Sequence, residues 1–250
     1  MIYENKIEYK AYGKYALFTD PITKIGGEKF SYEIPTYSAL KGLTESIYWK
    51  PTFIWKIDSV RIMNPIQMIS KGMRPIHYEK MNKPNMAIYT YLYQVEYRIK
   101  AHFEWNTNRK EDLEGDWNEH KHWQIAKRML ERGGRRDCYF GSRECQCFVE
   151  PCDFDEGTGY YDDKPDRYFG TMVHGITYPD EQVYDKLKGK MTVRLWKPVM
   201  RNGVIEYLPP DLDPSDKNMA HKIIGDRADK KFKSGENFVG LLEFDDEGMF

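Results

Sequence analysis

The pattern that most constrains the fold is the strict alternation of apolar and polar residues from Val95 to Glu104. Every second residue is apolar, and the residues between them are charged or histidine. Because successive side chains of a β-strand point to opposite faces, this period of two predicts a half-buried strand. The chain therefore folds around a sheet with one face in the core and one polar face.

The elements around this strand follow the order β-α-β-β-α-β. Alternation from Tyr3 into 15–18 predicts an opening strand, and an apolar stripe that begins at Thr36 and must end before Pro51 predicts a helix. Residues 53–62 predict a strand whose parity slips near Asp58-Ser59, as at a bulge. A helix at about 118–132 and a strand near 143–150 complete the order. It is the order of the ferredoxin-like α+β fold, which we assign to residues 1–150.

Two further regions interrupt or follow this domain. Residues 64–85 contain three prolines and a basic stretch, which predicts an inserted loop or hairpin. Beyond residue 150 the pattern contains strands only, with 168–176 as one strand and 191–199 paired to 203–208 through Asn202-Gly203. We therefore expect a small antiparallel β-sheet domain over 151–210 and an irregular tail over 211–250.

Composition and missing motifs exclude several classes of protein. The chain of 250 residues has no apolar signal region and no run of roughly 18 apolar residues, so we expect a soluble cytoplasmic protein without membrane contact. It lacks a P-loop, a G-x-S-x-G elbow, an H-E-x-x-H motif and a calcium loop. The four cysteines lack paired C-x-x-C spacing, which favours reduced thiols over a zinc site.

The net charge of −1 hides a basic segment. Residues 118–143 contain seven Lys or Arg against three acids, whereas 153–186 is rich in acids. Such a run is often only a solvated helix face. Here it adjoins a candidate anion site, which favours binding of a nucleic acid.

The candidate anion site is the start of the helix predicted at 118–132. Two residues can cap it, Asp116 with Glu119 three residues on, or Asn118. With either cap, Lys121 and His122 fall in the first turn or turn and a half. Unpaired backbone N–H groups and the helix dipole favour an anion there and disfavour the protonated form of a histidine. The sequence therefore predicts a phosphate site with a neutral histidine beside it.

A set of tyrosine, lysine and histidine can cleave RNA without a metal ion. The ribose 2′-hydroxyl is the nucleophile, so the protein must only move protons and stabilise charge on the phosphorus oxygens. His122 can exchange a proton near neutral pH, Lys121 can stabilise the charge, and Tyr48 can orient the hydroxyl or assist proton transfer. The alternatives are that His122 is a structural histidine and Tyr48 a core aromatic. His120 is a reserve candidate.

Many separate motifs, in the same order, carry a resemblance to a known family. They include Tyr15-Ala16-Leu17-Phe18, Gly133-Gly134-Arg135-Arg136 and Val193-Arg194-Leu195-Trp196. The remaining matches lie within 19–29, 35–51, 65–76, 118–122, 143–146 and 170–175. Over about 1–210 the chain resembles the CRISPR-associated RAMP proteins of the Cas-five class in type I-C (Dvulg) systems.

The resemblance implies an endoribonuclease that needs no metal or other cofactor and cuts the repeat hairpin of precursor CRISPR RNA. The catalytic set of the family maps onto Tyr48, Lys121 and His122. The family also implies that the protein stays on the 5′ handle of the mature guide RNA, with the backbone and large subunits of the type I-C interference complex as partners. The alternative is a non-catalytic subunit that binds guide RNA.

Contacts to RNA are expected to be mainly with phosphates, which basic side chains neutralise. The candidates lie in the first loop, in the insertion and after the second helix: Lys24, Lys29, Lys71, Arg74, Arg135 and Arg136.

Overall fold

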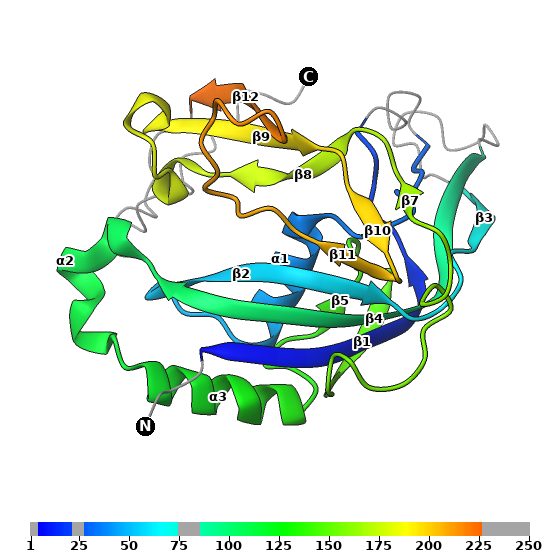
Figure 1. The fold of residues 1–250 in the computed structure, drawn as a ribbon, viewed down its shortest axis with the longest axis horizontal. Coiled ribbons are helices and arrows are strands. Elements are labelled where there is room, and N and C mark those ends of the chain that lie inside the picture. The colour runs from blue at the N-terminus through cyan, green and yellow to red at the C-terminus, as the bar shows by residue number, and fades with distance from the viewer. Residues whose placement is uncertain (1–4, 22–27, 75–85, 227–250) are drawn as a thin grey trace, which may run out of the picture.

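The alternating segment forms the middle of β4 (Ala87–Trp105), the longest strand of the chain's described part. The computed structural model describes residues 5–21, 28–74 and 86–226. Val95, Tyr97, Ile99, Ala101 and Phe103 are all buried, and the residues between them are partly exposed. The predicted half-buried strand is therefore confirmed, and β4 is the strand around which the larger sheet is built (Figure 1).

Within the described residues the larger sheet has nine strands, in the order β5-β6-β1-β4-β2-β11-β10-β7, with β3 also paired to β4. Their bounds are β1 (Lys6–Ala16), β2 (Phe53–Ile62), β3 (Met68–Met73), β5 (Cys138–Tyr139), β6 (Gln146–Pro151), β7 (Arg167–Tyr168), β10 (Val199–Arg201) and β11 (Val204–Glu206). The neighbours β6, β1, β4 and β2, together with two helices, form the ferredoxin-like core. The predicted α+β class and its element order are confirmed.

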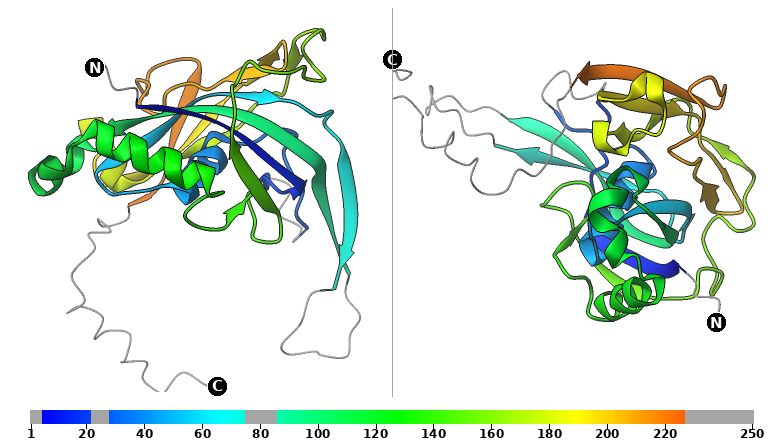
Figure 2. Two further views of the ribbon diagram at one scale, coloured as in Figure 1. Left: turned by 90° about the horizontal axis from the view of Figure 1, so that it is seen from below. Right: turned by 90° about the vertical axis from the view of Figure 1, so that its left-hand side faces the viewer.

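Two helices complete this core, α1 (Tyr37–Ile47) and α3 (Glu119–Glu131). The Thr36 side chain accepts a hydrogen bond from the Ala39 backbone N–H and so caps α1. The helix ends before Tyr48, whose backbone is extended. Both helices lie against the same face of the larger sheet (Figure 2). A short helix, α2 (Lys110–Leu113), joins the end of β4 to the region before α3.

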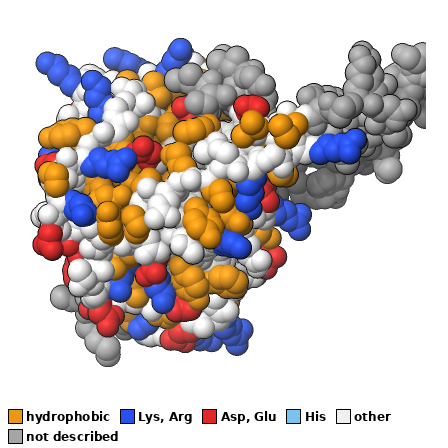
Figure 3. Space-filling view, turned by 90° about the vertical axis from the view of Figure 1, so that its right-hand side faces the viewer, with side chains coloured by type: hydrophobic (Ala, Val, Ile, Leu, Met, Phe, Trp, Pro, Cys, Tyr) orange, Lys and Arg blue, Asp and Glu red, His pale blue; other side chains and the backbone are white. Residues whose placement is uncertain are grey.

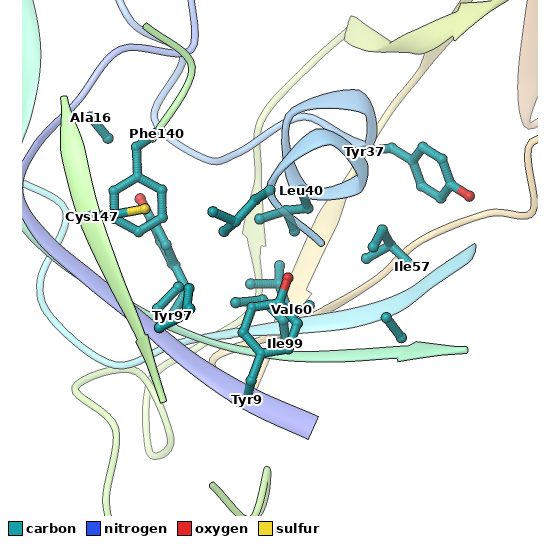
Figure 4. Close-up of a cluster of buried hydrophobic side chains, with 14 of the residues drawn as sticks. Tyr9, Ala16, Tyr37, Leu40, Ile57, Val60, Tyr97, Ile99, Phe140 and Cys147 are labelled. Atoms are coloured by element: carbon teal, nitrogen blue, oxygen red, sulfur yellow. The ribbon is translucent and has the colours of Figure 1, made fainter. Parts of the chain in front are cut away.

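The main core lies between these helices and the sheet (Figure 4). Leu40 of α1 is fully buried, as are Tyr9 of β1 and Ile99 of β4. The Tyr9 hydroxyl shares a 2.7 Å hydrogen bond with Thr44 Oγ1 of α1, so its polar atom has a partner inside the core. This packing fixes the end of α1, which carries Tyr48.

Strand β4 changes partners along its length. Its first part, up to Leu92, pairs with β3, and its later part, from Tyr97, pairs with β2. Between the two lies Gln94, which has a positive φ of 51°. The expected parity slip in β2 is present as a register shift between Ile57 and Ser59. The insertion predicted over 64–85 therefore contains a strand, β3, which pairs antiparallel with β4. Residues 75–85 of the insertion lie outside the described residues.

The second half of the chain differs from the sequence prediction in its pairing. The Asn202-Gly203 turn does form a hairpin, but between β10 and β11, which extend the larger sheet. Residues 190–196 form β9 (Lys190–Trp196), which pairs with β8 (Met172–Thr177) and β12 (Met219–Asp226) in a separate sheet. The expectation of an irregular tail was therefore wrong for residues 219–226. The boundaries proposed at 150 and 210 remain predictions.

The acid-rich segment after β6 lies on the polar face of the larger sheet. Arg61 of β2 binds Asp162 at 2.6 Å and donates to the backbone carbonyls of Phe154, Glu156 and Gly157. Arg98 of β4 donates to the carbonyl of Asp153. These contacts hold residues 153–162 against the sheet and account for part of the local excess of acids.

Candidate active site

The first turn of α3 positions Lys121 and His122. Of the two caps that the sequence allows, the structure uses Asn118, whose Oδ1 accepts from the Lys121 backbone N–H at 3.0 Å. Asp116 therefore does not cap the helix and lies just before it. The exposed Lys121 side chain and the buried His122 side chain leave the helix in different directions.

His122 contacts Tyr48, although 74 residues separate them. Its Nδ1 lies 2.9 Å from the Tyr48 hydroxyl, and its Nε2 lies 2.9 Å from the backbone carbonyl oxygen of Asp116. A carbonyl oxygen only accepts, so in the neutral ring Nε2 carries the hydrogen and Nδ1 accepts from Tyr48. The two residues thus form a defined pair in which a proton can pass from the hydroxyl to the imidazole.

Both members of the pair are buried. The exposed fraction is 0% for His122 and 1% for Tyr48. Aromatic rings of Phe53, Phe103 and Trp105 surround the imidazole, with centroids 5.3 to 6.5 Å away. On the side of α2, Trp117 stacks on Trp105 at 5.5 Å. In this conformation no substrate atom can reach the ring nitrogens.

Asp116 is a site residue to which sequence reasoning gave only a capping role. Its carboxylate binds the Lys121 ammonium at 2.5 Å, accepts from the Thr52 hydroxyl at 3.0 Å and lies 3.4 Å from His122 Nε2. The hydrogen bond from Lys121 holds the pKa of Asp116 below its usual value. Asp116 therefore remains an anion and connects Lys121 to the buried pair.

The Tyr48 phenol is protonated at neutral pH. Burial and, to a smaller extent, the negative charge of Asp116 raise its pKa to about 12, although the positive charge of Arg135 opposes the rise. Tyr48 can therefore donate a hydrogen bond to His122, and it can act as a base only if its own proton moves to the imidazole at the same time.

Arg135 and Arg136 lie beside this pair. Their backbone N–H groups donate at 3.0 Å to the carbonyls of Ile47 and Ser46, which are the last groups of α1. Both side chains are exposed. These bonds complete the end of α1 and keep two cations there, of which Arg135 acts electrostatically on Tyr48.

The other basic residues singled out in the sequence lie at the far end of β4. Lys71 Nζ lies 3.4 Å from the centre of the Tyr15 ring, and Lys29 Nζ lies 5.1 Å from that of Tyr89. Arg74 follows β3 and is exposed, whereas Lys24 lies outside the described residues. On the face shown in Figure 3, Lys and Arg side chains are scattered among hydrophobic and acidic ones. The structure therefore does not bring these residues together with Tyr48, Lys121 and His122.

Other features of the described residues do not add to this site. A cavity of about 210 Å³ between α1, the end of β4 and the smaller sheet is lined by Tyr37, Trp105 and Arg194, and by none of the three catalytic candidates. All four cysteines are free thiols. Among the described segments we find no helix of the length and hydropathy that a bilayer crossing requires.

Comparison with known proteins gives consistent matches. Residues 7–207 match the family described as CRISPR-associated protein (Cas_Cas5). A protein of Mannheimia succiniciproducens named CRISPR pre-crRNA endoribonuclease Cas5d is 25% identical over 242 residues, which cover 82% of this chain and 96% of that protein. A protein of Thermus thermophilus with the same name is 27% identical over 158 residues, or 59% of this chain and 65% of that protein.

A solved structure described as that of a CRISPR-associated protein is similar in fold. It has a TM-score of 0.68 and 33% sequence identity, and the match covers 83% of this chain and 94% of the solved chain. The similarity agrees with the RAMP-like α+β fold expected from the sequence.

Proposed function

Because the chain belongs to the CRISPR-associated Cas5 protein family, we propose that it is an endoribonuclease that cleaves the repeat hairpin of precursor CRISPR RNA. Two relatives carry the name pre-crRNA endoribonuclease. The observation that carries the proposal is the hydrogen bond between Tyr48 and His122, to which Asp116 connects the Lys121 ammonium. Two separate segments, the end of α1 and the first turn of α3, supply the three proposed catalytic residues.

In the proposed reaction the 2′-oxygen attacks phosphorus, and the bond from phosphorus to the 5′-oxygen breaks. One member of the pair of Tyr48 and His122 takes the 2′-hydroxyl proton, and the other gives its proton to the leaving 5′-oxygen. Lys121 stabilises the negative charge on the non-bridging oxygens. The products are a 2′,3′-cyclic phosphate and a 5′-hydroxyl. The scheme leaves open which of Tyr48 and His122 is base and which is acid.

The scheme requires neither a metal ion nor an organic cofactor. This part of the proposal is tested by cleavage of a labelled repeat hairpin in excess EDTA, with the product ends identified by mass. We expect cleavage to continue and to give cyclic phosphate and 5′-hydroxyl ends. Products with a 3′-hydroxyl and a 5′-phosphate, or activity that returns only when Mg²⁺ is added, would contradict the mechanism.

We further propose that phosphates of the RNA contact the exposed arginines beside Tyr48 and the basic residues at the other end of β4. The set is the one inferred from the sequence, Lys24, Lys29, Lys71, Arg74, Arg135 and Arg136. Arg135 and Arg136 hold α1 through their backbone, so replacing their side chains leaves those bonds in place.

Replacing both Arg135 and Arg136 by glutamine is therefore expected to weaken repeat binding and to flatten its salt dependence. Each lost phosphate contact lowers the slope of log K against log salt by about 0.7 to 0.9, so the double variant should lose about 1.4 to 1.8. Filter binding at several salt concentrations measures the slope. A matched pair of exposed basic residues within α3, Lys127 and Arg128, serves as the control. An equal loss in both double variants would contradict a specific contact.

As partners we propose the mature guide RNA, held by its 5′ handle, and the backbone and large subunits of a type I-C interference complex. The burial of His122 and Tyr48 favours a second candidate function, that of a guide-binding subunit without catalysis. Tight repeat binding with no cleavage under any ionic condition would support this second function.

A further inference from the structure

Asp116 occupies both positions that a substrate would need. Its carboxylate binds the Lys121 ammonium, where the proposed reaction places a phosphate oxygen. Its backbone carbonyl oxygen accepts a hydrogen bond from His122 Nε2, the ring nitrogen that Tyr48 does not contact. One residue of the chain therefore binds both groups that the RNA must contact.

The segment that carries Asp116 also covers the imidazole. We call residues 114–118 the Asp116 turn; it runs from the 3-10 turn after α2 to the cap of α3. Glu114, Gly115 and Asn118 are exposed, whereas His122 beneath is completely buried. The turn therefore lies between His122 and solvent.

The contacts that hold the turn are few and partly exposed to water. The Lys121 side chain is 52% exposed and that of Asp116 is 31% exposed, so their ion pair is weak and open to exchange with another anion. Trp117 stacks on Trp105, but its indole N–H is buried without a hydrogen-bond partner in the described part of the chain. An unpaired buried donor raises the free energy of the conformation in which the turn covers His122. We therefore expect that the turn can be displaced at a small cost in free energy.

We infer that Asp116 is an internal competitor of the RNA: the Asp116 turn closes the site in the free protein, and a phosphate that takes Lys121 from Asp116 displaces the turn and opens access to the pair of Tyr48 and His122. The inference rests on the proposed function for the identity of the ligand. The inference explains how a buried His122 can still act in catalysis. The closed form is the resting state of the free protein, and the site opens when RNA binds. The inference also explains why an anion is already present at the start of α3.

The first test measures access to His122 without any RNA. Diethyl pyrocarbonate modifies accessible imidazoles, and trypsin cleavage after Lys121 separates His120 from His122 for mass analysis. Because a minor open state is populated at about 0.1 to 10%, His122 should react about ten- to a thousandfold more slowly than the exposed His120. Equal modification rates at His120 and His122 in the wild-type protein would overturn the inference. This measurement needs no variant.

Trp117→Ala removes the stack on Trp105. It should raise the rate at which diethyl pyrocarbonate modifies His122 towards the rate at His120. Trp123→Ala is the matched control, because this indole belongs to α3 but donates to the Lys6 carbonyl instead of closing the turn. A rise in the Trp123 variant and none in the Trp117 variant would contradict the assignment of the cover to the turn.

The second test measures competition directly, with the repeat hairpin carrying deoxyribose at the cleavage site so that binding is not followed by cleavage. Asp116→Asn removes the charge that holds Lys121, and affinity should rise about two- to fivefold, the range for an exposed ion pair. Glu119→Gln removes the same charge three residues away and should change affinity less. Equal gains in both variants would show a general charge effect and overturn the competition.

The two tests separate the inference from the proposed function. If the protein binds no repeat RNA, the proposed function fails while the labelling experiment still decides whether the turn is closed. If RNA is bound and cut but His122 labels as fast as His120, the function stands and the inference fails.

Discussion

A repeat RNA with a single deoxyribose immediately upstream of the cut is expected to bind normally and to remain uncut. The proposed reaction uses that 2′-hydroxyl as its only nucleophile, so its removal leaves no group to attack phosphorus. Cleavage should fall to the uncatalysed background, whereas phosphate contacts, which dominate affinity, are unchanged. Gel analysis of labelled RNA gives both quantities.

The control is the same RNA with the deoxyribose two nucleotides further upstream, which should be cut at the normal rate. Cleavage of the first RNA at the same position would mean that water is the nucleophile. The arrangement of Tyr48, Lys121 and His122 would then need another interpretation.

Replacing His122 by alanine is expected to reduce the cleavage rate about 10²- to 10⁴-fold, the range for loss of a general acid or base. His122 contacts Tyr48 through Nδ1, so the variant also leaves the Tyr48 hydroxyl without this partner. Repeat binding should change little, because the exposed cations remain. Single-turnover kinetics with a parallel binding assay distinguish the two effects.

His122 is fully buried, so its loss can also destabilise the protein. His122→Asn is therefore the second variant, because its amide oxygen can still accept from Tyr48 but cannot exchange a proton. His120→Ala, an exposed position on the same helix, is the control for loss of an imidazole. An unchanged cleavage rate in both His122 variants would exclude the proposed site.

The elements of the first domain could be predicted because their signals are local. The period of two in β4, the start of a helix at Thr36 and the slip near Asp58 are all visible in short windows of sequence, and each is present in the structure. The proximity of Tyr48 and His122 is different. It depends on the packing of α1 and α3 on one sheet. The chemistry of the residue types and the resemblance to a family suggested the set, but no local pattern in the sequence predicts the contact.

The role of Asp116 could not be predicted because two residues competed for one cap. Both Asp116 and Asn118 are good caps, and their difference in free energy is small. The structure uses Asn118, which leaves the Asp116 carboxylate for Lys121 and Thr52. Which residue caps the helix therefore decides which residue enters the site.

The pairing of the second half was mispredicted because turns are local and strand partners are not. The Asn202-Gly203 turn was recognised from its residues, both of which have a positive φ. The sequence predicts one strand over 191–199 before this turn, whereas the structure has two strands there, separated at Pro198. Proline cannot donate to a ladder, and the chain leaves one sheet after Trp196 and enters the other at Val199.

The change of partner along β4 has a consequence for how such a protein can diverge. One end of this strand carries the hairpin with β3, and the other end carries Trp105 beside His122. The span from Tyr97 to His102 is paired with β1 on one side and with β2 on the other. Mutations that alter the hairpin are therefore buffered from the reacting groups by a rigid span. Under the proposed function, substitutions in the hairpin can change which RNA is bound while Tyr48 and His122 keep their positions.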